Sequence, residues 1–364
     1  MKDRNKEIEE IDEIDEIIIT EELSDESDMR YEHFRFVADK GQTPMRVDKF
    51  LTVRMENASR NRIQTAADLG CILVNDKAVK SNYKIKPEDV VTIVMDTPRR
   101  EFEIIAEDIP LNIIYEDEYV LVVNKDPGMV VHPGHGNYNG TMVNALAWHL
   151  RNEDNFESSD PRLGLVHRID KDTSGLLVVA KTPEAKANLS AQFFEKTTER
   201  KYAALVWGRV KDEEGRIESH LGRDPRNKLL MTVFPDGDYG KLAITHYKIL
   251  ERLGYVTLVE CVLETGRTHQ IRVHMKSIGH TIFNDERYGG NEILKGLPLG
   301  KYRQFVRNCF STCPRQVLHA QTLGFTHPHT GERMRFEAAL PEDIEGLLDK
   351  WRTYVSSAKE GKNE

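Results

Sequence analysis

A single aspartate in a turn-forming stretch is the strongest candidate for catalysis in this sequence. Residues 164–175 read GLVHRIDKDTSG and precede the apolar run 176–180. The small and polar residues at 172–175 indicate a turn, so we expect Asp170 in a loop at the mouth of a sheet. A carboxylate held there can act as a nucleophile or as a base. The alternative is that Asp170 or Asp172 only stabilises the turn.

Two further stretches contain residues that could act on the same substrate. Residues 264–275 read ETGRTHQIRVHM, in which Gly266 ends a strand and Thr268 can begin a helix. Arg267 would lie just before that helix, where its guanidinium can keep a nearby carboxylate ionised. Tyr202 opens another strand, and its ring could stack on a planar base. Taken alone, Arg267 could equally be a surface residue or form a structural ion pair, and Tyr202 could be a core aromatic.

The apolar runs around these residues predict the elements that position them. We expect strands at 119–123, 176–180, 202–207, 243–247 and 255–263, and helices at 184–194, 268–278 and 341–354. Strands outnumber helices, and turns of hairpin length separate several of them. This pattern favours an α+β fold with a mixed, mainly antiparallel sheet and flanking helices.

A smaller module precedes this region. In residues 45–95, two short helices should be followed by a small hairpin and a closing strand at 90–94. The module has nine Lys or Arg against six Asp or Glu. Four of these bases fall in or beside the predicted helices: Arg46, Lys49, Arg60 and Arg62. They could bind a phosphate backbone, or they could be ordinary bases on a solvated face.

Composition changes mark the remaining segments. We expect an acidic, flexible tail at 1–40, a linker at 96–110 that contains prolines and arginines, and a large domain at 111–354. Residues 355–364 are polar and should be frayed.

The net charge of −9 over 364 residues is misleading, because the acidic residues cluster at the N-terminus. Residues 1–32 carry −10, with 14 acids and 4 bases, whereas the other 332 residues carry 46 acids and 47 bases. A polyanionic partner is therefore not excluded by charge. The tail also places isoleucines at near-helical spacing. It is either a solvated segment that opposes aggregation, a helix that binds a partner, or an internal competitor for an RNA groove.

Several protein classes are excluded by the same arithmetic. No apolar run approaches the roughly 20 residues that span a bilayer, and the acidic start does not resemble a secretory signal. Four cysteines cannot form a disulfide framework, which fits a reducing compartment. We expect a cytoplasmic protein without a membrane partner and, as the default, a monomer.

Four stretches together resemble one family closely. Residues 166–181 match the HRLDKDTSGLLVVAK motif of the RluA/RluD-type pseudouridine synthases, with Ile169 in place of Leu. The run GRTHQIRVHM at 266–275, the pair Lys201-Tyr202 and the stretch 318–328 match further signatures of that family. Residues 45–95 resemble its S-four-like RNA-binding domain. The resemblance covers about 45–345, and one departure is Asp126, where the family usually reads Asn-Lys-Pro.

The resemblance implies an isomerase that converts uridine to pseudouridine in structured RNA. It favours 23S large-subunit ribosomal RNA as the substrate and leaves tRNA as the alternative. It implies Asp170 as the catalytic carboxylate, Arg267 as the residue that keeps it ionised and Tyr202 as the stacking ring. Ile271 would wall the pocket, and Arg168 would occupy the space left by the flipped base. His167 would contact the substrate as part of the same motif. The reaction requires neither a metal nor a cofactor.

Three other functions fit parts of the sequence. A metal hydrolase could use His132, His135 and the histidines of the motifs, but there is no HExxH motif and no paired CxxC. A non-catalytic RNA-binding factor for ribosome assembly would need only the small module. A glycosidase would normally use a pair of carboxylates, and it would release free uracil instead of forming pseudouridine.

Overall fold

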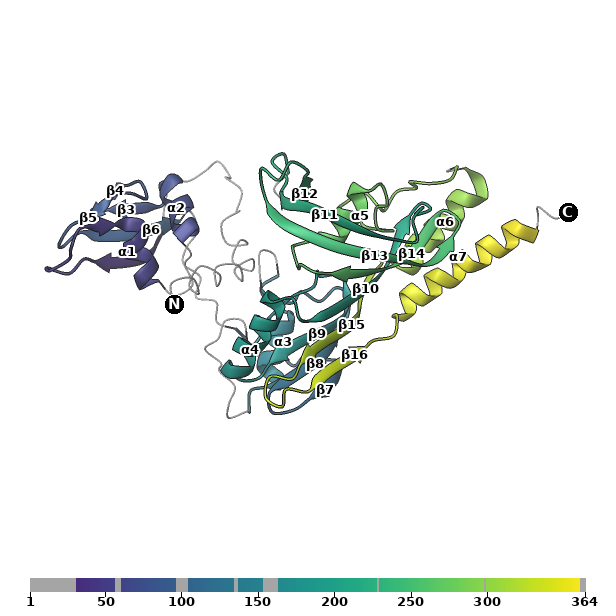
Figure 1. Ribbon diagram of the computed structural model, residues 1–364, viewed down its shortest axis with the longest axis horizontal. Helices are drawn as coiled ribbons and strands as arrows, with labels where there is room; N and C mark the ends of the chain where they lie inside the picture. The colour runs from purple at the N-terminus through teal and green to yellow at the C-terminus, as the bar shows by residue number, and fades with distance from the viewer. Residues whose placement is uncertain are drawn as a thin grey trace. The chain divides into compact units, whose positions relative to one another are not determined.

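The computed structural model of the protein describes residues 31–55, 60–95, 104–133, 137–152, 163–227, 229–297 and 299–360. These residues belong to two compact units, with those up to Met95 in the small unit and those from Ile104 onward in the large unit (Figure 1). Each unit has its own apolar core.

The small unit packs two helices against a short sheet. Its strands pair in the order β1-β6-β3-β4, and β2 pairs separately with β5. The elements of this unit are β1 (Tyr31–Val37), β2 (Met45–Arg46), α1 (Val47–Arg54), α2 (Arg60–Asp68), β3 (Ile72–Val74), β4 (Lys77–Ala78), β5 (Lys84–Ile85) and β6 (Val90–Met95).

Local sequence explains the small unit well. Phe50 and Leu51 on α1 and Ile63 on α2 are buried together, as the apolar spacing predicts. The turn between β3 and β4 contains Asn75 and Asp76, both with positive φ, which is the backbone conformation that a tight hairpin turn requires. The two predicted helices and the hairpin are therefore present.

The large unit is built on one extended sheet flanked by helices. Its elements are β7 (Ile113–Glu116), β8 (Val120–Lys125), α3 (Met142–His149), β9 (Ser174–Ala180), α4 (Pro183–Phe194), β10 (Glu199–Trp207), β11 (Glu214–Arg223), β12 (Met231–Phe234), β13 (Lys241–Leu253), β14 (Val256–Leu263), α5 (Gln270–Ser277), α6 (Gly300–Thr312), β15 (Leu318–Thr326), β16 (Arg333–Glu337) and α7 (Glu342–Glu360).

The strands of this sheet follow the order β12-β11-β13-β14-β10-β15-β9-β8-β7, and β16 pairs with β15. Among the described strands, β9 and β15 pair in parallel and the other neighbours pair antiparallel. At the parallel contact Gly175 has a φ of +118°, and a Cβ atom there would lie 2.2 Å from the Ala320 carbonyl oxygen. Only glycine fits this position. The expected α+β fold with a mainly antiparallel sheet is confirmed.

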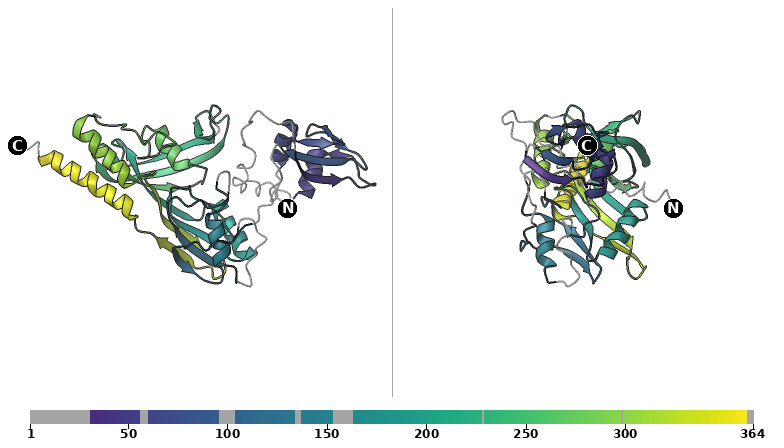
Figure 2. Two further views of the ribbon diagram at one scale, coloured as in Figure 1. Left: turned by 180° about the vertical axis from the view of Figure 1, so that it is seen from behind. Right: turned by 90° about the vertical axis from the view of Figure 1, so that its left-hand side faces the viewer.

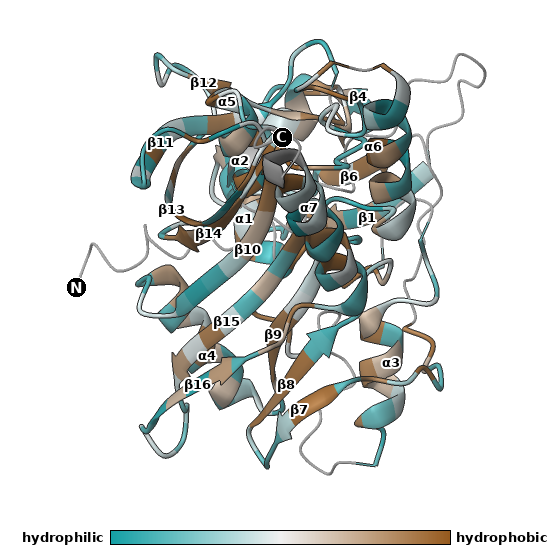
Figure 3. Cartoon of the chain, turned by 90° about the vertical axis from the view of Figure 1, so that its right-hand side faces the viewer, coloured by the Kyte–Doolittle hydropathy of each residue, from teal (hydrophilic) through white to brown (hydrophobic). Residues whose placement is uncertain are grey.

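Helices cover both faces of the sheet near β8 and β9, which explains why residues 120–123 and 176–180 are apolar (Figure 3). Leu121 and Val123 face the core that contains α3, whereas Val120 and Val122 face the core that contains α4. Farther along, α6 and α7 pack beside each other, with Trp351 of α7 fully buried (Figure 2). The sheet is thereby held rigid beneath the loops that precede β9 and α5.

The structure differs from the predicted boundaries at three places. Strand β1 lies within the segment that we expected to be a flexible tail, because its pairing with β6 extends the small sheet. Residues from Ile104 belong to the large unit, where the Asn144 side chain donates to the Ile105 carbonyl oxygen, so the linker predicted at 96–110 ends earlier. Helix α7 continues to Glu360 and includes residues predicted to fray.

Candidate active site

A buried lysine holds the loop that carries Asp170 through hydrogen bonds to backbone carbonyl oxygens. Lys125 at the end of β8 is almost fully buried, and its Nζ donates to the carbonyl oxygens of Asp126, Met129 and Lys171 at 2.7–2.9 Å. The Thr173 N–H closes the turn by donating to the Asp170 carbonyl oxygen at 3.1 Å. These contacts tie the turn after β8 to the loop before β9, so the Asp170 backbone is fixed. Burial lowers the pKa of Lys125 to about 7.

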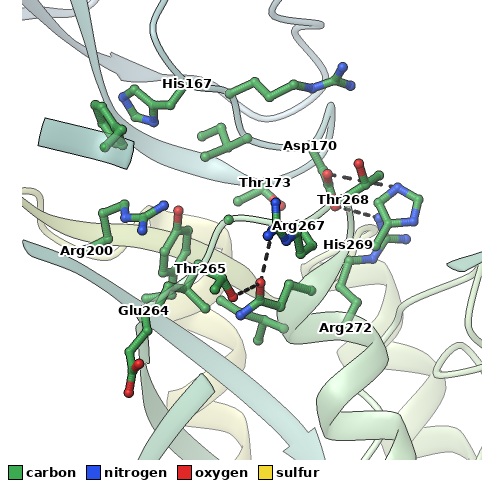
Figure 4. A pocket seen from close by; sticks show the side chains of 18 of the residues that line it. His167, Asp170, Thr173, Arg200, Glu264, Thr265, Arg267, Thr268, His269 and Arg272 are labelled. Atoms are coloured by element: carbon green, nitrogen blue, oxygen red, sulfur yellow. Dashed lines mark hydrogen bonds and ion pairs between the residues drawn. The ribbon is translucent and has the colours of Figure 1, made fainter. Parts of the chain in front are cut away.

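The Asp170 carboxylate has one oxygen bound and one oxygen facing a pocket. Its Oδ2 accepts a hydrogen bond from Arg272 Nη1 at 2.7 Å, whereas Oδ1 lies 4.0 Å from His269 Nε2 (Figure 4). No described residue donates a hydrogen bond to Oδ1. The Asp170 side chain is 21% exposed and lines the pocket. A substrate atom could therefore reach Oδ1.

Electrostatics keep Asp170 ionised. Burial raises its pKa, but the charges of His269 and Arg272 outweigh burial and hold the pKa at about 2. Burial lowers the pKa of His269 to about 4, so this imidazole is neutral at pH 7. The Arg272 guanidinium is then the main charge that stabilises the carboxylate. Arg272 is itself fixed by the buried Asp285, which accepts from its Nε and Nη2 at 2.7 and 2.9 Å.

The sequence predicted Arg267 as the partner of Asp170, but in the structure the arginine that binds the Asp170 carboxylate is Arg272. Arg267 lines the same pocket, but its Nε donates to the Leu242 carbonyl oxygen at 3.1 Å. The reason is the start of α5: His269 has a left-handed φ of +54°, and the helix begins at Gln270 instead of Thr268. The available sequence signal was an arginine with an apolar residue on each side in the sequence, Ile271 and Val273, within a predicted helix.

Tyr202 and Ile271 lie in the same pocket as Asp170. Tyr202 is 8% exposed in β10, and burial raises the pKa of its hydroxyl, which is therefore protonated at neutral pH. Ile271 in the first turn of α5 is buried against the core and closes part of the wall. The structure thus brings both residues next to the carboxylate.

The two residues before Asp170 have different environments. The exposed Arg168 lines the pocket, and its charge also lowers the pKa of Asp170. His167 accepts a hydrogen bond from the Val178 N–H at 3.0 Å and stacks on Phe193. Burial lowers the pKa of His167 to about 3, so it is neutral. It presents an uncharged ring to the pocket and ties the loop to β9.

In the small unit, a buried aspartate organises two of the four predicted RNA-binding residues. Asp48 is fully buried and accepts hydrogen bonds from Arg46 at 2.8 and 3.1 Å and from Arg60 at 3.2 Å. The side chains of Arg46 and Arg60 remain about half exposed. Lys49 is exposed on α1. Arg62 belongs to α2, and its side chain lies outside the described residues.

Within the described residues, no group of three or more His, Cys, Asp or Glu side chains is placed to hold a metal ion. His135, considered above as a ligand, lies outside them. No helix in the described part of the chain is long and apolar enough to cross a bilayer.

Known proteins match both units. The family model for RNA pseudouridylate synthase matches residues 119–277, and the model for the S4 domain matches residues 45–91. A protein of Chlorobaculum parvum, named as an uncharacterized RNA pseudouridine synthase, is 47% identical over 322 residues, which cover 88% of this chain and 98% of that protein. The chain belongs to the RNA pseudouridylate synthase family.

The synthase is therefore an isomerase, and the predicted family and enzyme class are confirmed. It is also 42% identical over 314 residues to the ribosomal large subunit pseudouridine synthase D of Zymomonas mobilis, with 83% of this chain and 92% of that protein covered. A solved human structure, RNA Pseudouridylate Synthase Domain Containing 4, has the same fold, with a TM-score of 0.51 and 22% identity. That match covers 66% of this chain and 93% of the human chain.

Proposed function

We propose that this synthase converts uridine to pseudouridine in large-subunit ribosomal RNA and that Asp170 is its catalytic carboxylate. The choice of RNA is supported by the relative named as a ribosomal large subunit synthase and by the S4 domain match. The role of Asp170 is supported by one observation above all. The carboxylate is ionised and directs one oxygen without a hydrogen-bond donor into a pocket that also contains Tyr202.

The reaction breaks the bond between N1 of uracil and C1′ of ribose and joins C5 of the same uracil to C1′. Asp170 can attack the base, attack C1′ or remove a ribose proton, and each of these steps needs the carboxylate in its ionised form. Arg272 supplies that condition, because its guanidinium holds Oδ2 and leaves Oδ1 available. A carboxylate is a weak nucleophile, so accurate positioning must supply much of the rate.

The target uridine must leave the RNA stack before Asp170 can reach it, which costs a few kcal/mol. In this proposal the uracil stacks on the ring of Tyr202 and is enclosed by Ile271. The exposed guanidinium of Arg168 occupies the space that the base leaves. The small unit adds phosphate contacts through Arg46, Lys49 and Arg60, which raise affinity and orient the RNA.

Mapping pseudouridines in ribosomal RNA tests this proposal. Cells without the gene should lack one or more pseudouridines, and expression of the wild-type chain should restore them. Expression of Asp170→Asn should not restore them, although the variant should still bind RNA. An unchanged map in the deletion strain would contradict the choice of substrate. Release of free uracil by the purified protein would indicate a glycosidase instead of an isomerase.

A further inference from the structure

The active-site pocket contains a buried arginine that has no carboxylate partner. Arg200 in β10 lines the pocket and is 8% exposed. Its Nε is buried and has no hydrogen-bond partner within the described part of the chain. The guanidinium lies 5.4 Å from the centre of the Phe193 ring, and no carboxylate is among the charges acting on it. Arg272 and Arg315, the two other buried arginines among the described residues, each bind an aspartate.

An unpaired buried charge lowers stability unless something compensates for it. The fold nevertheless makes room for this one, because a Cβ atom at Gly266 would lie 2.9 Å from Arg200 Nη1. Glu264 also lines the pocket, but its carboxylate binds His246 at 2.5 Å and points away from Arg200 (Figure 4). The site is therefore built to hold a cation whose partner comes from outside the chain.

The place of Arg200 relative to Asp170 indicates which part of a substrate it would meet. Tyr202 lies two residues farther along the same strand and lines the same pocket. The Tyr202 hydroxyl is influenced by the charges of both Arg200 and Asp170, and these two side chains lie at opposite ends of the pocket (Figure 4). A base stacked on Tyr202 would then have the carboxylate at one end and the guanidinium at the other.

We propose that Arg200 binds the carbonyl oxygens of uracil and stabilises the negative charge that the base carries after it leaves the ribose. This inference rests on the proposed function. When the N1–C1′ bond breaks, its electron pair stays on the uracil and spreads over N1, O2 and O4. The uracil rotates, C5 forms the new bond to C1′, and the proton lost from C5 is replaced by one on N1. No external electron donor or acceptor takes part.

A phosphate of the RNA backbone is a less suitable partner for Arg200. The exposed bases Arg168 and Lys196 line the same pocket and are accessible to phosphates. Arg200 is nine-tenths buried beside the stacking ring, where the base must enter. A preorganised donor at a site of developing charge acts mainly on the chemical step, and its removal typically costs about 100-fold or more in rate.

Single-turnover kinetics with a saturating RNA substrate test the proposal. Arg200→Met removes the charge while keeping similar length, and Lys201→Met is the matched control. Lys201 is the next residue in β10, lies outside the pocket and makes its ion pairs with Glu199 and Glu260. We expect Arg200→Met to lower the rate of pseudouridine formation by about 100-fold with little change in RNA affinity. Lys201→Met should behave like the wild type.

Two further measurements keep the result interpretable. Guanidinium ion added to Arg200→Ala should restore part of the rate of pseudouridine formation. Arg200→Lys keeps the positive charge and should retain a higher rate than Arg200→Met.

Each contrary result has a distinct meaning. A wild-type rate in Arg200→Met, or a loss confined to RNA affinity as expected for a phosphate contact, would overturn the role of Arg200. A wild-type protein that forms no pseudouridine in any ribosomal RNA would instead overturn the proposed function.

Discussion

The two units each contain an aspartate held by arginine, and only one of these aspartates faces a pocket. Asp48 in the small unit and Asp170 in the large unit both have a pKa of about 2. Asp48 is fully buried and accepts hydrogen bonds from Arg46, Arg60, Gln64 and the Lys49 N–H. Asp170 accepts a single side-chain hydrogen bond and keeps one oxygen open to the pocket.

This difference shows that a depressed pKa alone does not identify a catalytic carboxylate. Both groups are stabilised in the ionised form by guanidinium groups, but the oxygens of Asp48 are used by the protein itself. What distinguishes Asp170 is unused acceptor capacity that a substrate can reach. Asp48 fixes the positions of bases on the surface, and Asp170 is available for chemistry.

The largest effect should come from Asp170→Asn. We expect the rate of pseudouridine formation to fall by at least about 1,000-fold, because the amide can act neither as a nucleophile nor as a base. RNA affinity should change little. Asp172→Asn is the matched control two residues away, since Asp172 is not among the residues that line the pocket. Comparable activity of both variants in a chromatographic assay of nuclease-digested RNA would remove Asp170 from the mechanism.

The opposite pattern is expected for Asp48→Asn. The change leaves the two guanidinium groups without their buried anion, and we expect it to destabilise the small unit by about 3 kcal/mol. Hydrogen exchange of the α1 and α2 amides during denaturant titration would measure this loss. Turnover at saturating RNA should remain close to that of the wild type. Strong protection in the variant would show that the Asp48 cluster is not structural.

Removal of the Arg272 charge should change the pH profile. In the wild type Asp170 is deprotonated above pH 2, so its ionisation should not limit the rate between pH 8 and about 4. In the double variant Arg272→Gln with Asp285→Asn, burial is opposed only by the charges of His269 and Arg168, so the pKa of Asp170 should rise from about 2. We expect a roughly tenfold lower rate at neutral pH and an acid limb at higher pH. Single-turnover rates between pH 4 and pH 8 would measure the position of this acid limb. An acid limb at the same pH as in the wild type would show that another group, and not Arg272, keeps Asp170 ionised.

The smallest effect should be that of Lys49→Gln. If Lys49 contacts one phosphate, the slope of log affinity against log salt should fall by about one. The rate at saturating RNA should not change. An unchanged slope would place Lys49 outside the RNA interface. Arg46 and Arg60, which Asp48 positions, would then remain as the proposed RNA contacts of the small unit.

Local patterns predicted much of this molecule, because they depend on neighbours in the sequence. The helices with Phe50 and Ile63, the β3–β4 hairpin and the apolar strand before Lys125 all follow from spacing and turn residues. The motif around Asp170 also located the pocket. These features need no knowledge of distant contacts.

The missed features depend on tertiary structure. The choice between Arg267 and Arg272 is set by the left-handed backbone of His269, which determines where α5 begins. The pairing of β1 with β6 joins segments about 60 residues apart, and the charge pattern of the tail gave no sign of it. The buried state of Arg200 was likewise invisible, because an arginine at the start of a strand normally reaches solvent.

The parallel contact between β9 and β15 determines when the enzyme becomes competent during its synthesis. Ser174 and His319 meet there although 145 positions separate them, and Leu318 of β15 also lines the pocket. A nascent chain that has already exposed Asp170 must wait for most of the remaining polypeptide before the cavity can close. Premature termination anywhere before β15 would therefore yield a product that carries the motif around Asp170 but lacks the complete pocket.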